Sequence, residues 1–297
     1  MSNEAALIAA LRALAPHPAA RGLADDAAVL EFGGEALVLT HDMMVEGVHW
    51  LPGQDPADVA YKLVAVNLSD LAAKGAEPLG VLLGYTLGPD DARFVAGLSE
   101  ALAEFDVPLL GGDTVSAPVG SARAIGLTAL GRATCQPVPS RGGAQVGDGV
   151  WVTGPLGGAM LGFEVLRDGA SGIDTSAFRR PRPLLAQGRA LAPLVSAMMD
   201  VSDGLLLDAS RMALASGVMI ALDGSAVPLA PGLPEARRHD ALTWGDDYQL
   251  LFTAAPHFAP DHPATTRVGT VAARGPHPVL LDGSAPVGAL GFQHGAL

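Results

Sequence analysis

The hydrophobic and polar positions in the first half of the chain follow two periods, and each period predicts one kind of element. Residues 3–14 place apolar side chains three and four positions apart, which predicts an amphipathic helix. Asp55 and Pro56 form a favourable helix start and Gly75 a typical helix end, so we expect a second helix over 56–74. The other predicted elements are strands over 27–31, 36–40, 80–87, 108–110 and 121–132, and a helix over 90–105.

A polar segment rich in proline and glycine, residues 137–143, interrupts this pattern, and we place a domain boundary there. The predicted domains are 1–137 and 138–297. The elements predicted for the second half are a strand over 149–153, a helix through 166, a helix over about 184–197, and a helix capped by Ser202 or Asp203 that ends at Ser216. The last part, residues 222–297, is rich in Pro and Gly, and its pattern does not order the strands.

Composition narrows the class of protein. With 297 residues, 49% of them hydrophobic, the chain can form two domains with separate cores, and its many Ala, Leu, Val and Gly residues are typical of an α/β or α+β protein. Apolar runs such as 79–87 are much shorter than the ~18 residues of a membrane span, and the first residues contain no basic segment. We therefore expect a cytoplasmic protein without a membrane anchor. The single cysteine, Cys135, excludes an intramolecular disulfide and a Cys-rich zinc site.

The net charge of −13 disfavours a nucleic-acid surface, because such surfaces depend on many Lys and Arg contacts to phosphate. An acidic protein can still bind a nucleotide if divalent cations lie between its carboxylates and the phosphates. The only lysines are Lys62 and Lys74, and neither lies in a Gly-x-x-x-x-Gly-Lys-Ser/Thr loop. No Gly-x-Gly-x-x-Gly segment follows a predicted strand either, so the standard nucleotide-binding loops are absent from the sequence.

Aspartates lie among apolar residues or glycines in five short segments. These segments contain Asp25 and Asp26, Asp42, Asp70, Asp113, and Asp200 with Asp203. Carboxylates are rarely buried without partners, and two of them ~4 Å apart repel each other by roughly 4 kcal/mol at an effective dielectric constant near ~20. If the segments converge on one cleft, they require cations. Mg²⁺ that bridges carboxylates to a polyphosphate is the arrangement we expect.

Several of these residues also have a purely structural interpretation. Asp42 and Asp113 could cap turns, and Asp70 could begin a helix at Ser69. No Pro or Gly interrupts the helix predicted over 56–74, however, so the polar pair Asn67 and Asp70 on one face of an apolar helix favours a ligand-facing patch.

Six segments together carry a resemblance to a known family. They are Asp25-Asp26, residues 40–50, residues 60–76, residues 111–114, residues 200–204 and residues 245–248. Their order and spacing, from about Glu4 to Gln293, resemble the motifs of the thiamine-monophosphate kinase family, which belongs to the aminoimidazole ribonucleotide synthetase-like superfamily. The run Asn67-Leu68-Ser69-Asp70 is the most specific of them.

The resemblance implies that ATP phosphorylates thiamine monophosphate to thiamine diphosphate. It also implies an α/β (α+β) fold with two domains: an N-terminal mixed sheet with helices, which binds ATP and several Mg²⁺ ions and forms a homodimer through the sheet, and a C-terminal α+β domain that closes the cleft. The acceptor is a phosphate monoester whose second pKa is near ~6, so it is a nucleophilic dianion at neutral pH. Catalysis would then need alignment and charge neutralisation but no general base.

The resemblance further assigns roles to individual residues. The implied metal ligands are Asp26, Thr40, His41, Asp42, Asp70, Asp113, Asp200 and Asp203. The implied ATP contacts are Gly112, Asp113, Arg141 and Ser202, and the implied contacts to thiamine monophosphate are His49, Asp246 and Phe292. No catalytic residue beyond the metal ligands is implied. We expect Cys135 to be a packed, unreactive thiol.

The chain departs from the family pattern at Ala24, His41, Trp244 and Asp246, where a Gly, a small hydroxyl residue, a Gly and a Glu are usual. Imidazole is a softer ligand than Mg²⁺ usually recruits. His41 therefore either packs on the strand face opposite Asp42 or enters the shell of the metals. Two alternatives remain open: another ATP-using enzyme of the superfamily, or a protein that binds thiamine phosphates or nucleotide without turnover.

Overall fold

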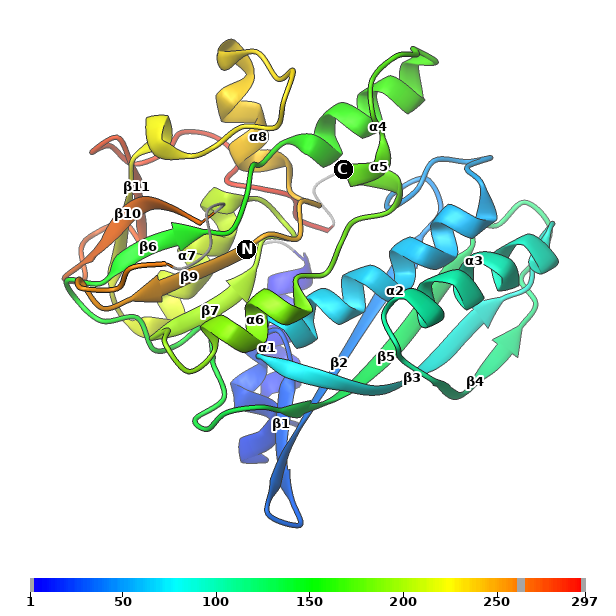
Figure 1. Ribbon diagram of the computed structural model, residues 1–297, viewed down its shortest axis with the longest axis horizontal. Coiled ribbons are helices and arrows are strands. Elements are labelled where there is room, and N and C mark those ends of the chain that lie inside the picture. Colours follow the sequence, from blue (N-terminus) through cyan, green and yellow to red (C-terminus); the bar gives the residue numbers. More distant parts are fainter. Residues whose placement is uncertain (1–2, 261–264, 295–297) are drawn as a thin grey trace.

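Two β-sheets, one in each half of the chain, organise the molecule (Figure 1). The computed structural model describes residues 3–260 and 265–294. The first sheet has the strand order β1-β2-β5-β3-β4, formed by β1 (Ala28–Phe32), β2 (Glu35–Val45), β3 (Ala76–Thr86), β4 (Leu109–Val115) and β5 (Ala124–Ala133). The second has the order β11-β8-β10-β6-β9-β7, formed by β6 (Gly149–Val152), β7 (Ala197–Asp200), β8 (Met219–Leu222), β9 (Leu250–Ala254), β10 (Thr266–Ala272) and β11 (Val279–Leu281). Both sheets are mixed, since β3–β4 and β8–β11 pair in parallel.

Helices cover both sheets. They are α1 (Asn3–Arg12), α2 (Pro56–Ala73), α3 (Asp91–Glu104), α4 (Gly158–Asp168), α5 (Ser176–Arg179), α6 (Leu185–Leu191), α7 (Leu205–Ser216) and α8 (Arg238–Trp244), with short 3₁₀ helices at Pro18–Leu23, Gly224–Ala226 and Glu235–Arg237. None of the helices within the described residues combines the length and the apolar character that crossing a membrane requires. The mixed sheets with covering helices agree with the expected α+β fold.

The helix α2 lies between the first sheet and the second half of the chain (Figure 1). It begins as predicted, because Asp55 accepts a hydrogen bond from the backbone N–H of Ala57 at 3.0 Å and Pro56 occupies the first turn. It ends at Lys74 and Gly75, and Gly75 has a positive φ of 58°. Every residue from 57 to 73 is buried, so α2 contacts protein on all sides.

The helices α2 and α3 cover one face of the first sheet and leave the other face open (Figure 1). Large apolar side chains are exposed on its strands, namely Phe32, Met43, Leu79, Leu82, Leu109, Leu110 and Val115. Strand β4 forms an edge of the sheet and is exposed along its whole length. The first sheet thus presents a group of exposed apolar side chains.

Several predicted boundaries are wrong. Strand β2 continues to Val45, so Asp42 lies inside the strand instead of at its end. The segment around Asp113 was expected after a strand but lies within β4, where Gly112 permits close pairing: a Cβ there would lie 2.0 Å from the backbone oxygen of Leu83. The helix predicted to about residue 197 ends at Leu191, and β7 follows.

The contact between α2 and α6 gives a first prediction. Gly188 lies so close to α2 that an added Cβ would lie 2.0 Å from the backbone oxygen of Ala72. Gly188→Ala should therefore lower the free energy of unfolding by about 1–3 kcal/mol, because the two helices must separate. Urea unfolding measures this loss, and Gln187→Ala on the same helix is the control. Equal stability of the two variants would contradict the close approach.

Candidate active site

The carboxylates of Asp26, Asp70 and Asp200 form a group, here called the carboxylate cluster, in which one oxygen of each lies within 4.8 Å of the others. Asp26 lies two residues before the start of β1, Asp70 lies on α2, and Asp200 ends β7, so both halves of the chain contribute. Two hydroxyl groups support the cluster. Thr40 donates a hydrogen bond to Asp70, and Ser69 donates one to Asp200 at 2.5 Å.

Asp42 faces the cluster from β2. It lies two residues after Thr40 on the same strand face, and its negative charge helps to raise the pKa of Asp70. The backbone N–H of Asp42 donates to Asn67 Oδ1 at 2.9 Å, and Asn67 Nδ2 donates to the backbone oxygen of Leu63 at 2.9 Å. Of the polar pair on α2, Asp70 thus belongs to the carboxylate cluster, whereas Asn67 ties the helix to the strand.

Three of these carboxylates resist ionisation. Burial, followed by the charge of Asp26, raises the pKa of Asp200 to about 8. Burial, followed by the charges of Asp26 and Asp203, raises the pKa of Asp42 to about 6. Burial, followed by Asp42 and Asp200, raises the pKa of Asp70 well above its ordinary value. Divalent cations would compensate this repulsion, and a donor set made only of oxygen atoms fits Mg²⁺.

Asp26 differs from the other members of the cluster because cations already contact it. Its Oδ2 accepts from Lys74 Nζ at 2.6 Å, and its Oδ1 accepts from Arg141 Nε at 2.7 Å. Lys74 also donates to Asp25 at 2.6 Å, and Arg21 donates to Asp25 at 2.5 Å. Burial alone would raise the pKa of Asp25, but Lys74 and Arg21 outweigh it and lower that pKa well below the ordinary value. Arg141, expected to contact ATP, thus pairs with Asp26.

The segment that precedes α7 is organised by Asp208. The Asp208 carboxylate accepts hydrogen bonds from the backbone N–H groups of Ser202 at 3.1 Å and Asp203 at 3.0 Å. The Asp203 carboxylate pairs with Arg211, which also donates to Asp208 at 3.0 Å. The N-cap of α7 is Gly204, so the prediction that Ser202 or Asp203 caps this helix is wrong. Asp203, an expected metal ligand, lies outside the carboxylate cluster.

A second group, here called the substrate-side group, consists of His49, Lys62 and Asp246. Lys62 Nζ donates to Asp246 Oδ2 at 2.5 Å and to the backbone oxygen of His49 at 3.0 Å. The Tyr248 hydroxyl donates to the other oxygen of Asp246 at 2.8 Å. His49 Nδ1 accepts from the backbone N–H of Val45 at 2.9 Å, so the neutral ring carries its proton on Nε2. The structure thus brings His49 and Asp246 together, as expected.

The last described residues lie next to this group. The ring centroids of His49 and His294 are 5.6 Å apart, and those of Phe292 and His294 are 4.9 Å apart. The backbone N–H of Phe292 donates to the backbone oxygen of Asp203 at 2.9 Å, which holds the segment near the start of α7. Burial lowers the pKa of His49 and favours its neutral form. Phe292 therefore lies near the side expected for thiamine monophosphate.

Gly112, Asp113 and His41 lie apart from both groups within one chain. Gly112 and Asp113 lie on the exposed edge strand β4. His41 alternates with Asp42 on β2 and is exposed on the other face, where its Nδ1 lies 2.9 Å from Thr128 Oγ1. Metal ligation by His41 is therefore not supported, and the structure favours the packing interpretation.

Sequence reasoning missed the two lysines of the site. Lys62 and Lys74 were considered only as candidates for a phosphate-binding loop, yet their exposed fractions are 1% and 0% and each pairs with an expected site carboxylate. A signal was available, because the only lysines of the chain both fall in the apolar helix 56–74. A buried ammonium group requires a carboxylate partner.

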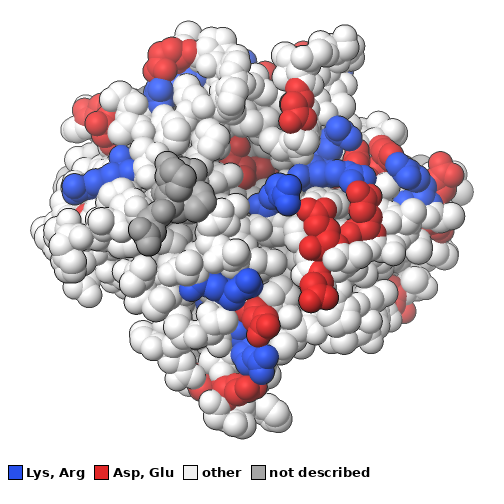
Figure 2. Space-filling view, viewed as in Figure 1, with Lys and Arg blue, Asp and Glu red and all other residues white. Residues whose placement is uncertain are grey.

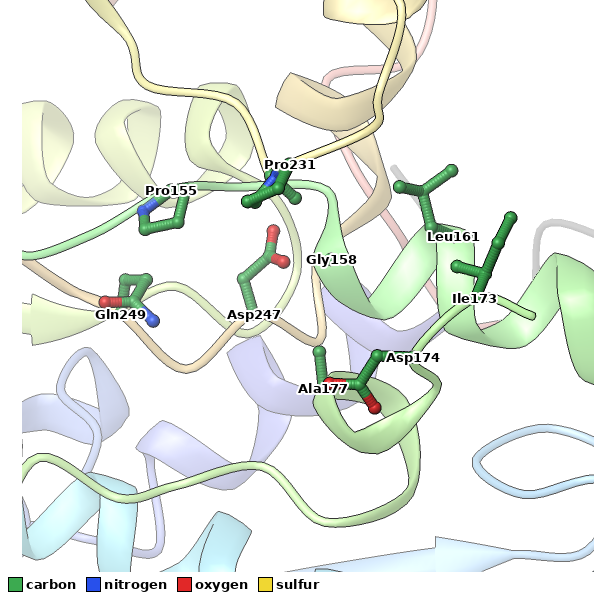
Figure 3. Close-up of a pocket in the computed structure, with 10 residues that line it drawn as sticks. Pro155, Gly158, Leu161, Ile173, Asp174, Ala177, Pro231, Asp247 and Gln249 are labelled. Atoms are coloured by element: carbon green, nitrogen blue, oxygen red, sulfur yellow. The ribbon is translucent and has the colours of Figure 1, made fainter.

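A pocket of about 300 Å³ lies beside the substrate-side group (Figure 3). Leu161 and Ile173 form apolar walls, and Asp247, the neighbour of Asp246, points into it from the segment before β9. The Asp247 carboxylate accepts from the backbone N–H of Gly157 at 3.0 Å at the start of α4. Burial raises the pKa of Asp247 to about 7. No member of the carboxylate cluster lines this pocket.

Comparison with family models defines the class of the chain. Residues 24–133 match the family described as "AIR synthase related protein, N-terminal domain", and residues 145–262 match "AIR synthase related protein, C-terminal domain". The protein is therefore a two-domain member of the AIR-synthase-related class, which confirms the predicted fold.

Individual relatives identify the family more closely. The chain is 36% identical over 250 residues to thiamine-monophosphate kinase of Escherichia coli, covering 78% of this chain and 75% of the relative. It is 40% identical over 262 residues to the enzyme of Caulobacter vibrioides, covering 82% and 73%. The solved structure "AaThiL complexed with AMPPCP and TMP" matches with a TM-score of 0.87 and 28% identity, covering 97% of this chain and 96% of that one. The chain belongs to the thiamine-monophosphate kinase family.

The raised pKa of Asp200 gives a second prediction, for the metal-free protein. Its folded pKa of about 8 lies above the ordinary value of 3.8, so between these pH values the folded state holds more protons than the unfolded state. The contribution of Asp200 to the free energy of unfolding therefore falls as pH rises through this window. Asp200→Asn should lose less stability than the wild type between about pH 5 and pH 8. Melting curves in a chelator measure this, and parallel pH profiles would contradict it.

Proposed function

We propose that this protein transfers the γ-phosphoryl group of ATP to thiamine monophosphate and forms thiamine diphosphate and ADP. The observation that carries this proposal is the carboxylate cluster, built by both halves of a chain that belongs to the thiamine-monophosphate kinase family. The similar structure AaThiL was solved with AMPPCP and TMP, which supports the same pair of ligands here. On the face drawn in Figure 2, basic side chains lie beside acidic ones and do not form one large basic patch.

The chemistry requires one new P–O bond and breaks another. An oxygen of the thiamine monophosphate dianion attacks the γ-phosphorus, and the bond from that phosphorus to the bridging oxygen of ADP breaks. The nucleophile needs no deprotonation near neutral pH, because the second pKa of a phosphate monoester is about 6. Alignment of the two phosphate groups and compensation of their charge are therefore the tasks of the protein.

The substrate-side group would position thiamine monophosphate. His49 can donate from Nε2 to a phosphate oxygen, since its Nδ1 already accepts from Val45. Asp246 is held by Lys62 and Tyr248 and would face the cationic thiamine part. Phe292, with 42% of its surface exposed, would cover the ring. On the other side, Ser202 and Arg141 remain the proposed ATP contacts.

The carboxylate cluster would hold Mg²⁺ together with Asp42 and Thr40. The ions would neutralise the phosphate oxygens during transfer. Oxygen ligands from strand β2, helix α2 and strand β7 meet at this place, and Asp42, Asp70 and Asp200 have raised pKa values that a cation would lower.

The third prediction tests the proposed reaction directly. With ATP and Mg²⁺, thiamine monophosphate should be converted to thiamine diphosphate, and thiamine should remain unchanged because it lacks the acceptor phosphate. Chromatographic analysis of products measures both reactions. Binding of both substrates without turnover would support the alternative of a non-catalytic binding protein and overturn the proposal.

The fourth prediction concerns the proposed metal ligands. Asp42→Asn and Asp70→Asn each remove a charge at nearly constant volume, so turnover should fall at least ~100-fold. The stability of the metal-free protein should change little or rise, since carboxylate repulsion is relieved. Cys135→Ser is the control and should retain turnover, because Cys135 belongs to neither group of the site and its thiol lies 3.8 Å from the backbone oxygen of Pro137. Turnover equal to that of the wild type in either Asp variant would remove that residue from the proposed site.

We further propose a homodimer through the open face of the first sheet, with domains divided at 1–137 and 138–297. Burial of the exposed apolar side chains on β3 and β4 would stabilise it. Asp113 lies on the same exposed strand and away from the cluster of its own chain, so a second copy could supply it as a metal ligand.

The fifth prediction tests this shared site by subunit complementation. Asp113→Asn and Asp42→Asn should each be inactive, and mixed dimers should regain activity because one site of each heterodimer contains both native residues. Turnover after mixing and subunit exchange measures this. Two variants that stay inactive after verified exchange would assign Asp113 to its own chain or to no site.

A further inference from the structure

The charges of the proposed metal site are unevenly distributed. Asp42, Asp70 and Asp200 have no Lys or Arg within hydrogen-bonding distance among the described residues, whereas both oxygens of Asp26 accept from cations. The site thus has one end that is already neutralised and one end that needs added cations.

Lys74 provides the cation that is most deeply buried at the neutralised end. Its Nζ donates to Asp25 Oδ1 at 2.6 Å, to Asp26 Oδ2 at 2.6 Å and to the backbone oxygen of Met198 at 3.3 Å. The exposed fraction of Lys74 is 0%. Two carboxylates and a carbonyl are also the ligand types of a hard divalent cation, so the ammonium group lies where such an ion could bind.

We propose that the Lys74 ammonium group acts as a built-in cation of the active site and takes the place of one divalent ion at Asp26. The added ions then bind at the end formed by Asp42, Asp70 and Asp200. Lys74 is a positioning residue in this scheme: it holds Asp26 in place and does not contact the substrates. The inference rests on the proposed function.

A divalent ion would not easily displace this ammonium group. Lys74 follows α2 directly, and no other carboxylate lies within hydrogen-bonding distance of its Nζ among the described residues. Displacement would therefore leave a buried charge without a partner, which is strongly unfavourable.

Lys62 provides a matched comparison on the same helix. It is also buried and also pairs with a carboxylate, but that carboxylate, Asp246, belongs to the substrate-side group. Removal of either ammonium group should destabilise the protein. Only removal of the Lys74 ammonium should open a new place for a metal ion.

The experiment counts Mn²⁺ ions bound per chain by electron paramagnetic resonance, with the full-length protein and Mn²⁺ alone. Lys74→Met should bind one Mn²⁺ more than the wild type, whereas Lys74→Arg and Lys62→Met should bind the same number as the wild type. A purely structural role of Lys74 would change stability without changing the count. Equal counts for Lys74→Met and the wild type would overturn the proposal.

A second variant keeps the test decisive if Lys74→Met does not fold. Lys74→Gln removes the positive charge, leaves both carboxylates of the site in place and keeps an amide that can donate a hydrogen bond to Asp25 or Asp26. It should also bind one additional Mn²⁺, and an unchanged count would again overturn the role of Lys74.

The number of bound Mn²⁺ ions is measured without turnover, so the inference and the proposed function can fail separately. If the wild type forms thiamine diphosphate but the Lys74 variants bind the same number of Mn²⁺ ions as the wild type, only this inference is rejected. Absence of the product with an altered count would reject the proposed function alone.

Discussion

The burial of charge on helix α2 is the constraint on which the rest of the structure depends. Four charged side chains of this helix and its C-cap have exposed fractions below 9%, namely Asp58, Lys62, Asp70 and Lys74. Charged groups at such depth need partners. The partners of Asp58 and Lys62 come from the second half of the chain: Arg179 and Arg180 pair with Asp58, and Asp246 pairs with Lys62. The polar surface of α2 therefore joins the two halves as well as forming the site.

This constraint explains why the site has two electrostatic regions. Lys74 pairs with Asp26 and Lys62 pairs with Asp246, so the charges of these two carboxylates are balanced without a bound ligand. Where α2 supplies Asp70, the charges of the neighbouring carboxylates help to raise the pKa of Asp70, and no lysine or arginine among the described residues pairs with it. A phosphate group can approach these carboxylates only together with cations. In the proposed function, the nucleotide and the metal would therefore depend on each other for binding.

The sequence predicted the elements better than it predicted their contacts. The start of α2 followed from Asp55 and Pro56, and the family followed from motifs such as the run ending at Asp70. The pairing of Lys74 with Asp26 could not be predicted, because it depends on how the turn before β1 meets the end of α2. The second part of strand β4 was also missed, because glycines are poor strand formers. Parallel pairing with β3 extends the strand through Asp113, and the sequence alone does not reveal this pairing.

Ligand binding and the packing of the two halves must be coupled in this architecture. Asp70 on α2 and Asp200 on β7 belong to one cluster, and the adjacent Ser69 bonds directly to Asp200. Lys62 similarly links the carbonyl of His49 to the carboxylate of Asp246. A change in the position of either half would thus move ligands of both proposed substrates at once. In the proposed function, cations that bind across this boundary would stabilise the packing of the two halves by mass action, and this packing would hold the two phosphate groups in line.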